Sequence, residues 1–290
     1  MSGNFRVCKH TNQELKFDFF DFKSIENPHY KYNNSNNYFC KIPNNFIKTD
    51  IRIEYGLHRI FYVVWFLIDR MKNYENISRI SIGNIMDICG YKRTSQKPAI
   101  LNEIIKCLLF LIESSYICAD FNYLEIGYDD IIEISIISEN FCPKNDFTII
   151  YGKNFDLIKN QINPRSNFEN MFMVYLYVCS HIINRSDTMS KEHNPEAYYG
   201  SLNDMVKTLH ISKKTASSCI NALSNFETPL FIKKETDTIT DAKTNAIKKI
   251  PNIYVINKDG YKQEIKWALE KITKTLVTNK NEISETKKEN

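Results

Sequence analysis

Apolar residues recur with the same helical spacing in two separate stretches of the chain. They are Ile82, Ile85, Met86 and Cys89 in the first stretch and Leu202, Met205, Val206 and Leu209 in the second. Both sets follow the spacing i, i+3, i+4, i+7, which is the pattern of a helix with one buried face. Ser81 and Ser201 stand directly before these stretches and predict the N-cap of each helix, because a serine side chain accepts a hydrogen bond from the first turn.

A second helix is predicted after each of these stretches. Its apolar positions are Leu101, Ile104, Ile105 and Leu108 in the first half and Ala216, Cys219, Ile220 and Leu223 in the second. Two short runs follow each helix and predict a hairpin, and the second run of each pair is β-branched and apolar. The predicted strands are "SSYICA" and 131–137 in the first half and "PLFIKK" and 252–257 in the second. Upstream, the bulky apolar stretches 58–71 and 167–185 predict one further helix in each half.

The order helix, helix, helix, strand, strand therefore occurs twice, which indicates a duplicated small domain. The predicted fold class is α+β, mainly helical. The predicted boundaries are 1–45 for a flexible N-terminal arm, 46–140 for the first domain, 141–166 for a linker, 167–260 for the second domain and 261–290 for a short helix and a disordered polar tail. The arm, with "FDFFDF" at 17–22, is either poorly ordered with room for one short strand, or an arm for oligomerisation or partner docking. The linker contains "FTIIYG" at 147–152, a candidate for one more strand.

Three helices followed by a hairpin, with a short turn between the second and third helices, resemble a winged helix-turn-helix. In the second domain, 201–209 resemble the supporting helix of that family, 210–212 the turn and 213–223 the recognition helix. His210 departs from the family pattern, in which glycine or a small polar residue is common at this place. Gly90 holds the equivalent place in the first domain. The expected architecture is two tandem winged helix-turn-helix domains.

The layout of residues 38–257 also resembles a more specific family. The stretches that carry this resemblance are "FCKIPNNFI", "YGLHRIFYVVWFLIDR" and "ISIGNIMDICGYK", followed by the paired second domain. They resemble the replication initiators and replisome-organiser proteins of low-GC bacterial plasmids and phages. The resemblance implies binding of duplex DNA at repeated origin sites and recruitment of host replication proteins.

The polar face of the predicted helix 213–223 distinguishes the second domain from the first. At 100° per residue, one sector of this helix collects Lys213, Lys214, Ser217, Ser218 and Asn221. No carboxylate occurs between residues 213 and 224. Asparagine can pair with adenine, serine with bases or phosphates, and lysine with phosphate or guanine. We therefore expect this face to enter the major groove; the alternative is an ordinary solvated face.

Charge also separates the two predicted wings. Residues 116–146 contain seven acidic residues against one lysine, whereas 201–260 contain nine lysines against six acidic residues. An anionic wing does not suit a phosphate backbone. The second domain is thus the expected DNA reader, with backbone contacts from Lys233, Lys234, Lys248 and Lys249. In the first domain, Lys92, Arg93 and Lys97 form either a phosphate grip or a plain charged loop.

Other classes of function find little support in the residues. The chain has no G-x-x-x-x-G-K-[ST] loop, no G-x-G-x-x-G turn and no H-E-x-x-H motif, and its eight cysteines form no C-x-x-C pair. The longest apolar run, "IFYVVWFLI", is too short to span a bilayer. We expect a cytoplasmic protein that does not bind membranes and is not an enzyme, with no catalytic residues, metal site or cofactor.

The net charge of only +4 leaves the partner open. Replication initiation is the expected role, and a winged-helix transcriptional regulator is the alternative within the same class. A protein-interaction module that does not bind DNA is the alternative in a different class. Two winged helices in one chain can cover two half-sites; a homodimer formed through the first domain can do the same.

Overall fold

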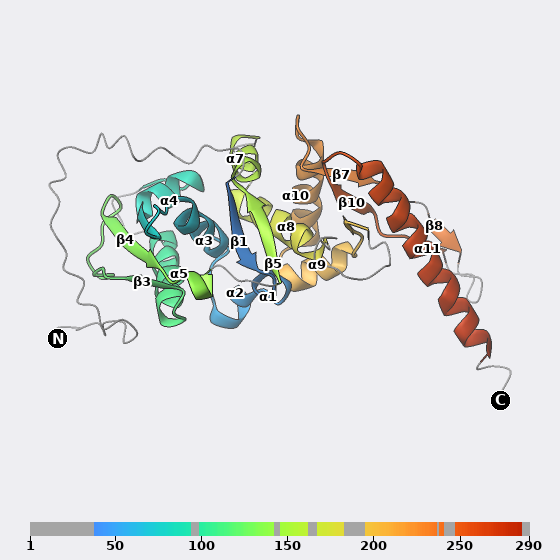
Figure 1. Ribbon diagram of the computed structural model, residues 1–290, viewed down its shortest axis with the longest axis horizontal. Coiled ribbons are helices and arrows are strands. Elements are labelled where there is room, and N and C mark those ends of the chain that lie inside the picture. Colours follow the sequence, from blue (N-terminus) through green and yellow to red (C-terminus); the bar gives the residue numbers. More distant parts are fainter. Residues whose placement is uncertain are drawn as a thin grey trace.

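The computed structural model describes residues 38–93, 99–141, 146–161, 167–182, 195–236, 238–240 and 247–285. The protein is α+β, with helices dominating and the strands gathered in small antiparallel sheets (Figure 1). None of the described helices is long and apolar enough to cross a membrane.

The first repeat is built from six elements. They are α3 (Phe61–Arg70), β2 (Ile77–Ser81), α4 (Ile82–Ile88), α5 (Ala99–Glu113), β3 (Ile117–Ala119) and β4 (Ile131–Ile136). The three strands form an antiparallel sheet in the order β2-β4-β3. Ser81 caps α4 as predicted, and its side chain accepts a hydrogen bond of 3.2 Å from the Asn84 amide.

The second repeat has the same element order. Its elements are α8 (Phe168–His181), β6 (Ala197–Tyr198), α9 (Leu202–Leu209), α10 (Lys213–Asn225), β7 (Phe231–Lys234) and β10 (Ile253–Ile256). Its sheet order, β6-β10-β7, matches the order in the first repeat. A hairpin of β8 (Thr238–Thr240) and β9 (Ile247–Lys249) lies between β7 and β10 in sequence. The sequence did not predict β2, which is partly polar, or β6, which has only two residues and so carries no strand pattern.

The candidate strand at 147–152 is confirmed, and it pairs with a strand in the segment predicted as a flexible arm. β1 (Phe39–Pro43), inside the predicted arm, pairs antiparallel with β5 (Phe147–Tyr151), inside the predicted linker. Cys40, Ile42, Thr148 and Ile150 face inward and are buried, and this burial is the physical reason for order here. We call this pair the β1–β5 ribbon. Residues 1–37 of the arm lie outside the described part of the chain.

Besides the C-terminal helix, four helices lie outside the repeats in the described part of the chain. They are α1 (Asn44–Lys48), α2 (Ile51–Tyr55), α6 (Ser138–Phe141) and α7 (Gly152–Gln161). The C-terminal helix, α11 (Tyr261–Glu285), is longer than the short helix predicted and extends into the predicted disordered tail. It packs on β10 and β6, where Ala268 is fully buried beside Ile253 and Val255.

The two repeats share one hydrophobic core. α3 is buried from Phe61 to Asp69, and α8 is buried along almost all of its length. Phe155 of α7 joins the two helices, because its ring stacks on Phe66 of α3 at 4.2 Å and meets Phe172 of α8 edge-on at 5.1 Å. A helix that is apolar all round needs cover on every side, and here each repeat, α7 and the ribbon supply part of that cover.

A buried ion pair links the start of α2, which precedes the first repeat, to the second repeat. Asp50 and Arg52 are both buried, and Arg52 Nε donates a 2.8 Å hydrogen bond to Asp50 Oδ1. Arg52 Nη2 donates a second bond of 3.2 Å to the backbone carbonyl of Leu209, the last residue of α9. Tyr62 donates to the Phe46 carbonyl at 2.6 Å and also lies 3.3 Å from Asp50 Oδ1.

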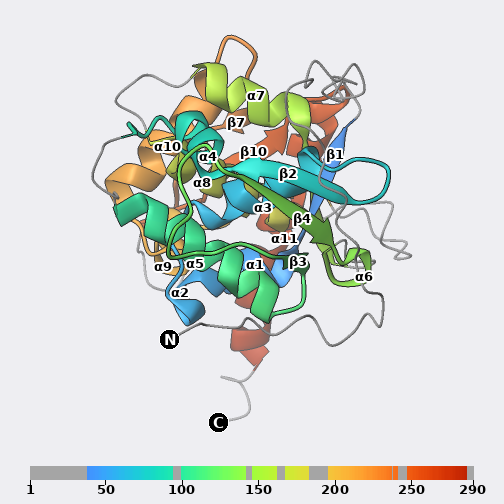
Figure 2. The ribbon, with the colours of Figure 1, turned by 90° about the vertical axis from the view of Figure 1, so that its left-hand side faces the viewer.

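The arrangement places α5 and α10 on one side of the molecule and the β1–β5 ribbon on another. In Figure 2, α5 and α10 lie on the left and β1 lies on the right. The helices that follow the two turns, α5 and α10, therefore lie on the same side of the molecule. The β1–β5 ribbon lies on another side.

We predict that Arg52→Ala lowers the free energy of unfolding by about 3–5 kcal/mol, because it leaves the Asp50 carboxylate buried without its partner. Urea unfolding followed by circular dichroism measures this. Lys106→Ala is the matched control, since Lys106 pairs with Glu103 at the surface and such pairs contribute about 0–1 kcal/mol. Equal effects of the two substitutions would show that the buried pair is not a structural link.

Candidate nucleic-acid interface

The turn that leads into α10 is held by backbone geometry and a serine cap. His210 ends α9 with a left-handed backbone, at φ 50°, and Gly90 takes the same region at φ 77° after α4. Histidine is among the residues that enter this region more often than most, which explains why it can stand where glycine is expected. Ser212 caps α10, and its hydroxyl accepts a 3.0 Å hydrogen bond from the Thr215 amide.

The two faces of α10 separate as the spacing predicted. Ala216, Cys219, Ile220 and Leu223 are buried, and α10 packs on α8. Lys213, Lys214 and Ser218 are exposed, and Ser217 and Asn221 are half-buried. The exposed face carries no carboxylate from the helix itself, and Lys213 and Lys214 lie in its first turn. A helix N-terminus carries a partial positive charge, so these lysines add to a field that attracts anions.

The lysines predicted to act beside α10 differ in their surroundings. Lys233 on β7 forms an ion pair of 2.8 Å with Glu235 and lies 3.5 Å from Asn221 Oδ1, so it bridges the sheet and the helix. Lys234 is exposed. Lys248 and Lys249 lie on β9, and the placement of their side chains falls outside the described part of the structure.

In the first repeat, Arg93 is engaged by carboxylates, which favours the charged-loop alternative over a phosphate grip. Its guanidinium forms ion pairs with both Asp87 and Asp129, which join the end of α4 to the acidic loop before β4. A phosphate would have to compete with two carboxylates for the same donors. Lys92 is exposed, and Lys97 lies outside the described residues. On α5, Lys106 pairs with Glu103 at 2.9 Å.

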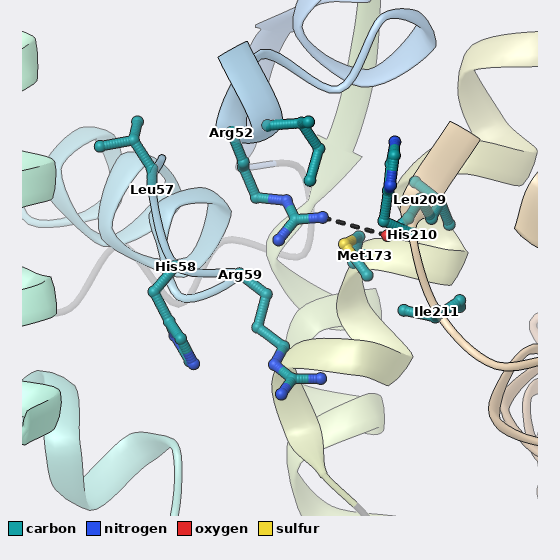
Figure 3. A pocket seen from close by; sticks show the side chains of 9 residues that line it. Arg52, Leu57, His58, Arg59, Met173, Leu209, His210 and Ile211 are labelled. Carbon is teal, nitrogen blue, oxygen red and sulfur yellow. Dashed lines mark hydrogen bonds between the residues drawn. The ribbon is translucent and has the colours of Figure 1, made fainter. Parts of the chain in front are cut away.

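A basic cleft, which the sequence did not reveal, lies where the two repeats meet. It is lined by Arg52, Ile53, Leu57, His58, Arg59, Met173, Leu209, His210 and Ile211. Figure 3 shows Arg52, His58, Arg59 and His210 around the junction of the α2–α3 segment, α8 and the turn between α9 and α10. These residues are far apart in sequence, so no local motif could bring them together. We call this the junction cleft.

Glu169 lies buried beside the junction cleft in the first turn of α8, with 1% of the residue exposed. Its Oε2 lies 3.6 Å from Arg59 Nε and 3.8 Å from His58 Nδ1. Arg59 also donates a 2.6 Å hydrogen bond to Asn170. Since both His58 and Arg59 precede α3, this cluster fastens the first helix of the second repeat to the first repeat.

Burial shifts the pKa values of the side chains in this cluster. Desolvation raises the pKa of the Glu169 carboxyl, although Tyr91 and Arg59 favour the charged form. Desolvation lowers the pKa of His58, and neighbouring Arg59 lowers it further. The pKa of Tyr91 is raised by burial and then by Glu169. The cluster is therefore a place where the fold opposes charge on both an acid and a base.

Comparison with known proteins gives no relative from which to transfer a function. No family model matches the chain, and no curated protein matches it significantly. Within the described ranges, His, Cys, Asp and Glu side chains form no group of three or more that could hold a metal ion.

We predict that Glu169→Gln removes a pH-dependent loss of stability. Because the folded pKa of Glu169 is raised above the unfolded value of about 4.5, the unfolded chain releases this proton first. Wild-type stability should therefore fall as the pH rises through that value to the folded pKa, and then level off. Urea unfolding of wild type and Glu169→Gln, at a series of pH values from about 4 to 8, measures the difference.

The difference between the two profiles isolates Glu169, because His58 titrates in both proteins. His58 acts in the opposite direction, since its lowered pKa costs stability as the pH falls below the unfolded value. Profiles that run parallel across the whole range would show that Glu169 ionises alike in the folded and unfolded chains.

Proposed function

We propose that this protein binds duplex DNA through two tandem winged helix-turn-helix units, with α10 as the main recognition helix. The observation that carries the proposal is the solvent-facing Lys/Ser/Asn face of α10, which has no carboxylate and begins at a capped helix N-terminus. The repeated order of helix, strand, helix, helix, strand, strand, with matching sheet order, supports the winged-helix assignment. The proposed activity is binding, without enzymatic chemistry.

In the proposed complex, α10 lies in the major groove. Asn221 reads adenine through its amide, Ser217 and Ser218 approach base edges, and Lys213 and Lys214 bind phosphates near the start of the helix. Asn221 is the candidate for base readout, because it is the amide side chain of this face, and its Oδ1 lies 3.5 Å from Lys233 Nζ. Lys234, with Lys248 and Lys249, contacts the backbone from the hairpin side.

The first repeat contributes less in this proposal, because Arg93 and Lys106 already pair with carboxylates. α5 nevertheless lies on the same side as α10, and the junction cleft involves the turn that precedes α10. A duplex that extends from α10 toward α5 would pass Arg59 and His210. The positive electrostatic field at the junction cleft is moderate, because Arg59 is also close to the Glu169 carboxyl group.

The proposed role is initiation of plasmid or phage replication, in the cytoplasm, with recruitment of host replication proteins. It rests on the resemblance of residues 38–257 to such initiators. A transcriptional regulator would use the same face, and a homodimer would double the number of half-sites. A module that binds only proteins is the rival from another class, and the salt dependence of DNA binding separates the two.

We predict that Lys213→Ala with Lys214→Ala weakens binding to duplex DNA and flattens its salt dependence. If each lysine neutralises one phosphate, the slope of log affinity against log salt should fall by roughly 1.8. Fluorescence anisotropy with a labelled duplex selected for binding, at several salt concentrations, measures both quantities. The matched control is Lys262→Ala with Lys266→Ala, which removes two exposed lysines from α11.

The control variant should bind as wild type does. Wild-type binding by the Lys213/Lys214 variant would remove α10 from the interface. Failure of the wild-type protein to bind any duplex at low salt would favour the protein-interaction module.

We predict that Asn221→Ala costs about 1–3 kcal/mol in binding of the preferred duplex and changes the salt slope little, because the lost contact is to a base. Selection of bound sequences from a random duplex pool, with wild type and with the variant, measures the change in preference. Relaxed preference at one adenine position is expected. Weakening that is uniform over all sequences would instead assign Asn221 to positioning.

A further inference from the structure

The outward face of the β1–β5 ribbon carries aromatic rings that the core does not use. Phe39 and Tyr151 stand directly opposite each other in the register, and their exposed fractions are 46% and 40%. Phe147 and Ile149 point to the same face of β5 and are half-buried. Alternate residues of both strands are buried against the body of the protein, so these rings have no place in the packing below.

Two lysines lie among these rings. The Nζ of Lys41 lies 4.1 Å from the centroid of the Phe147 ring, and the Nζ of Lys153 lies 5.8 Å from that of Tyr151. Within the described residues, neither lysine has an acidic partner within 4 Å. The outward positions of the two strands and Lys153 therefore combine aromatic and aliphatic side chains with positive charge, and they include no carboxylate.

The rings stand at both ends of the ribbon. Phe147 and Tyr151 are four residues apart on one strand, which separates them by roughly 14 Å at 3.4 Å per residue. The pair Phe39 and Tyr151 marks one end of the ribbon, and Phe147, opposite Pro43, marks the other, with Lys41 between them. Aromatic side chains that stack on successive bases, together with cations along the backbone, are the usual means of binding single strands without sequence preference.

We infer that the outward face of the β1–β5 ribbon is a binding site for single-stranded DNA. The bases stack on Phe39, Tyr151 and Phe147, and Lys41 and Lys153 bind the phosphates. The charge of the face favours this polyanion over an uncharged partner. Because the ribbon is turned away from α10, single-stranded and duplex DNA can be bound at the same time (Figure 2).

The experiment measures fluorescence anisotropy of a labelled oligothymidine of roughly 16 nucleotides, the upper end of single-strand site sizes. We expect Phe39→Thr with Tyr151→Thr to weaken binding by at least about tenfold, because each stacked base contributes substantially to affinity. Threonine keeps the preference for a strand, and both residues are exposed, so the fold should tolerate the change. Tyr74→Thr is the matched control, since Tyr74 is 91% exposed in a turn of the first repeat.

A separate measurement, the salt dependence of binding, tests Lys41 and Lys153. Lys41→Gln with Lys153→Gln should lower the salt slope of oligothymidine binding by roughly 1.4, at about 0.7 per phosphate of a single strand. Lys262→Gln with Lys266→Gln should leave it unchanged. Circular dichroism establishes that each variant is folded before binding is compared.

Duplex binding separates this site from the one at α10. The ribbon variants should bind duplex DNA as wild type does, and Lys213→Ala with Lys214→Ala should bind oligothymidine as wild type does. The inference is overturned if wild type binds no oligothymidine at low salt, if the ring variants bind it unchanged, or if the Lys213/Lys214 variant loses it. Binding of a peptide of residues 15–24 to the ribbon in place of oligothymidine would assign the face to the N-terminal arm.

Discussion

The fold depends on covering α8, a helix that is apolar on nearly every side. A single repeat has too few elements to surround it, so α3, α7, the β1–β5 ribbon and the α9–α10 pair all pack around one core. Polar groups at the edges of that core form hydrogen bonds and ion pairs that join these elements to one another. Arg52 is the clearest case: it neutralises Asp50 and occupies the carbonyl at the end of α9, where a positive charge also favours the helix dipole.

This shared core has a consequence for the proposed recognition of DNA. Two repeats joined by a flexible linker would sample many relative positions and lose entropy on binding one DNA molecule. Here α5 and α10 lie on one side of a single packed body. The distance between these two helices is therefore largely fixed before DNA binds. The buried Glu169 cluster adds to this rigidity, because it ties the start of α8 to the segment before α3.

The charges are distributed unevenly over this body, and this matters more than the small net charge. In the first repeat, Arg93 and Lys106 are neutralised by carboxylates. In the second, Lys213 and Lys214 stand in the first turn of α10 without acidic neighbours on the helix. The same contrast recurs at the ribbon, where Lys41 and Lys153 lie over aromatic rings and have no carboxylate within 4 Å among the residues that the structure describes. The proposed binding faces are thus the places where cations remain available.

The sequence by itself determined the local elements of the repeats and the polarity of α10. Helical spacing, the serine caps and β-branched runs depend on neighbours within a few residues, and the observed α4, α5, α9, α10 and their hairpins follow them. Only the tertiary structure decided that residues 39–43 pair with 147–151, that the repeats share a core, and that Arg52, Arg59 and His210 line one cleft. It also decided that Arg93 is neutralised. These outcomes depend on contacts between residues that are far apart in the sequence. The pattern of residues within a five-residue strand, or around one arginine, does not show which distant residue it will contact.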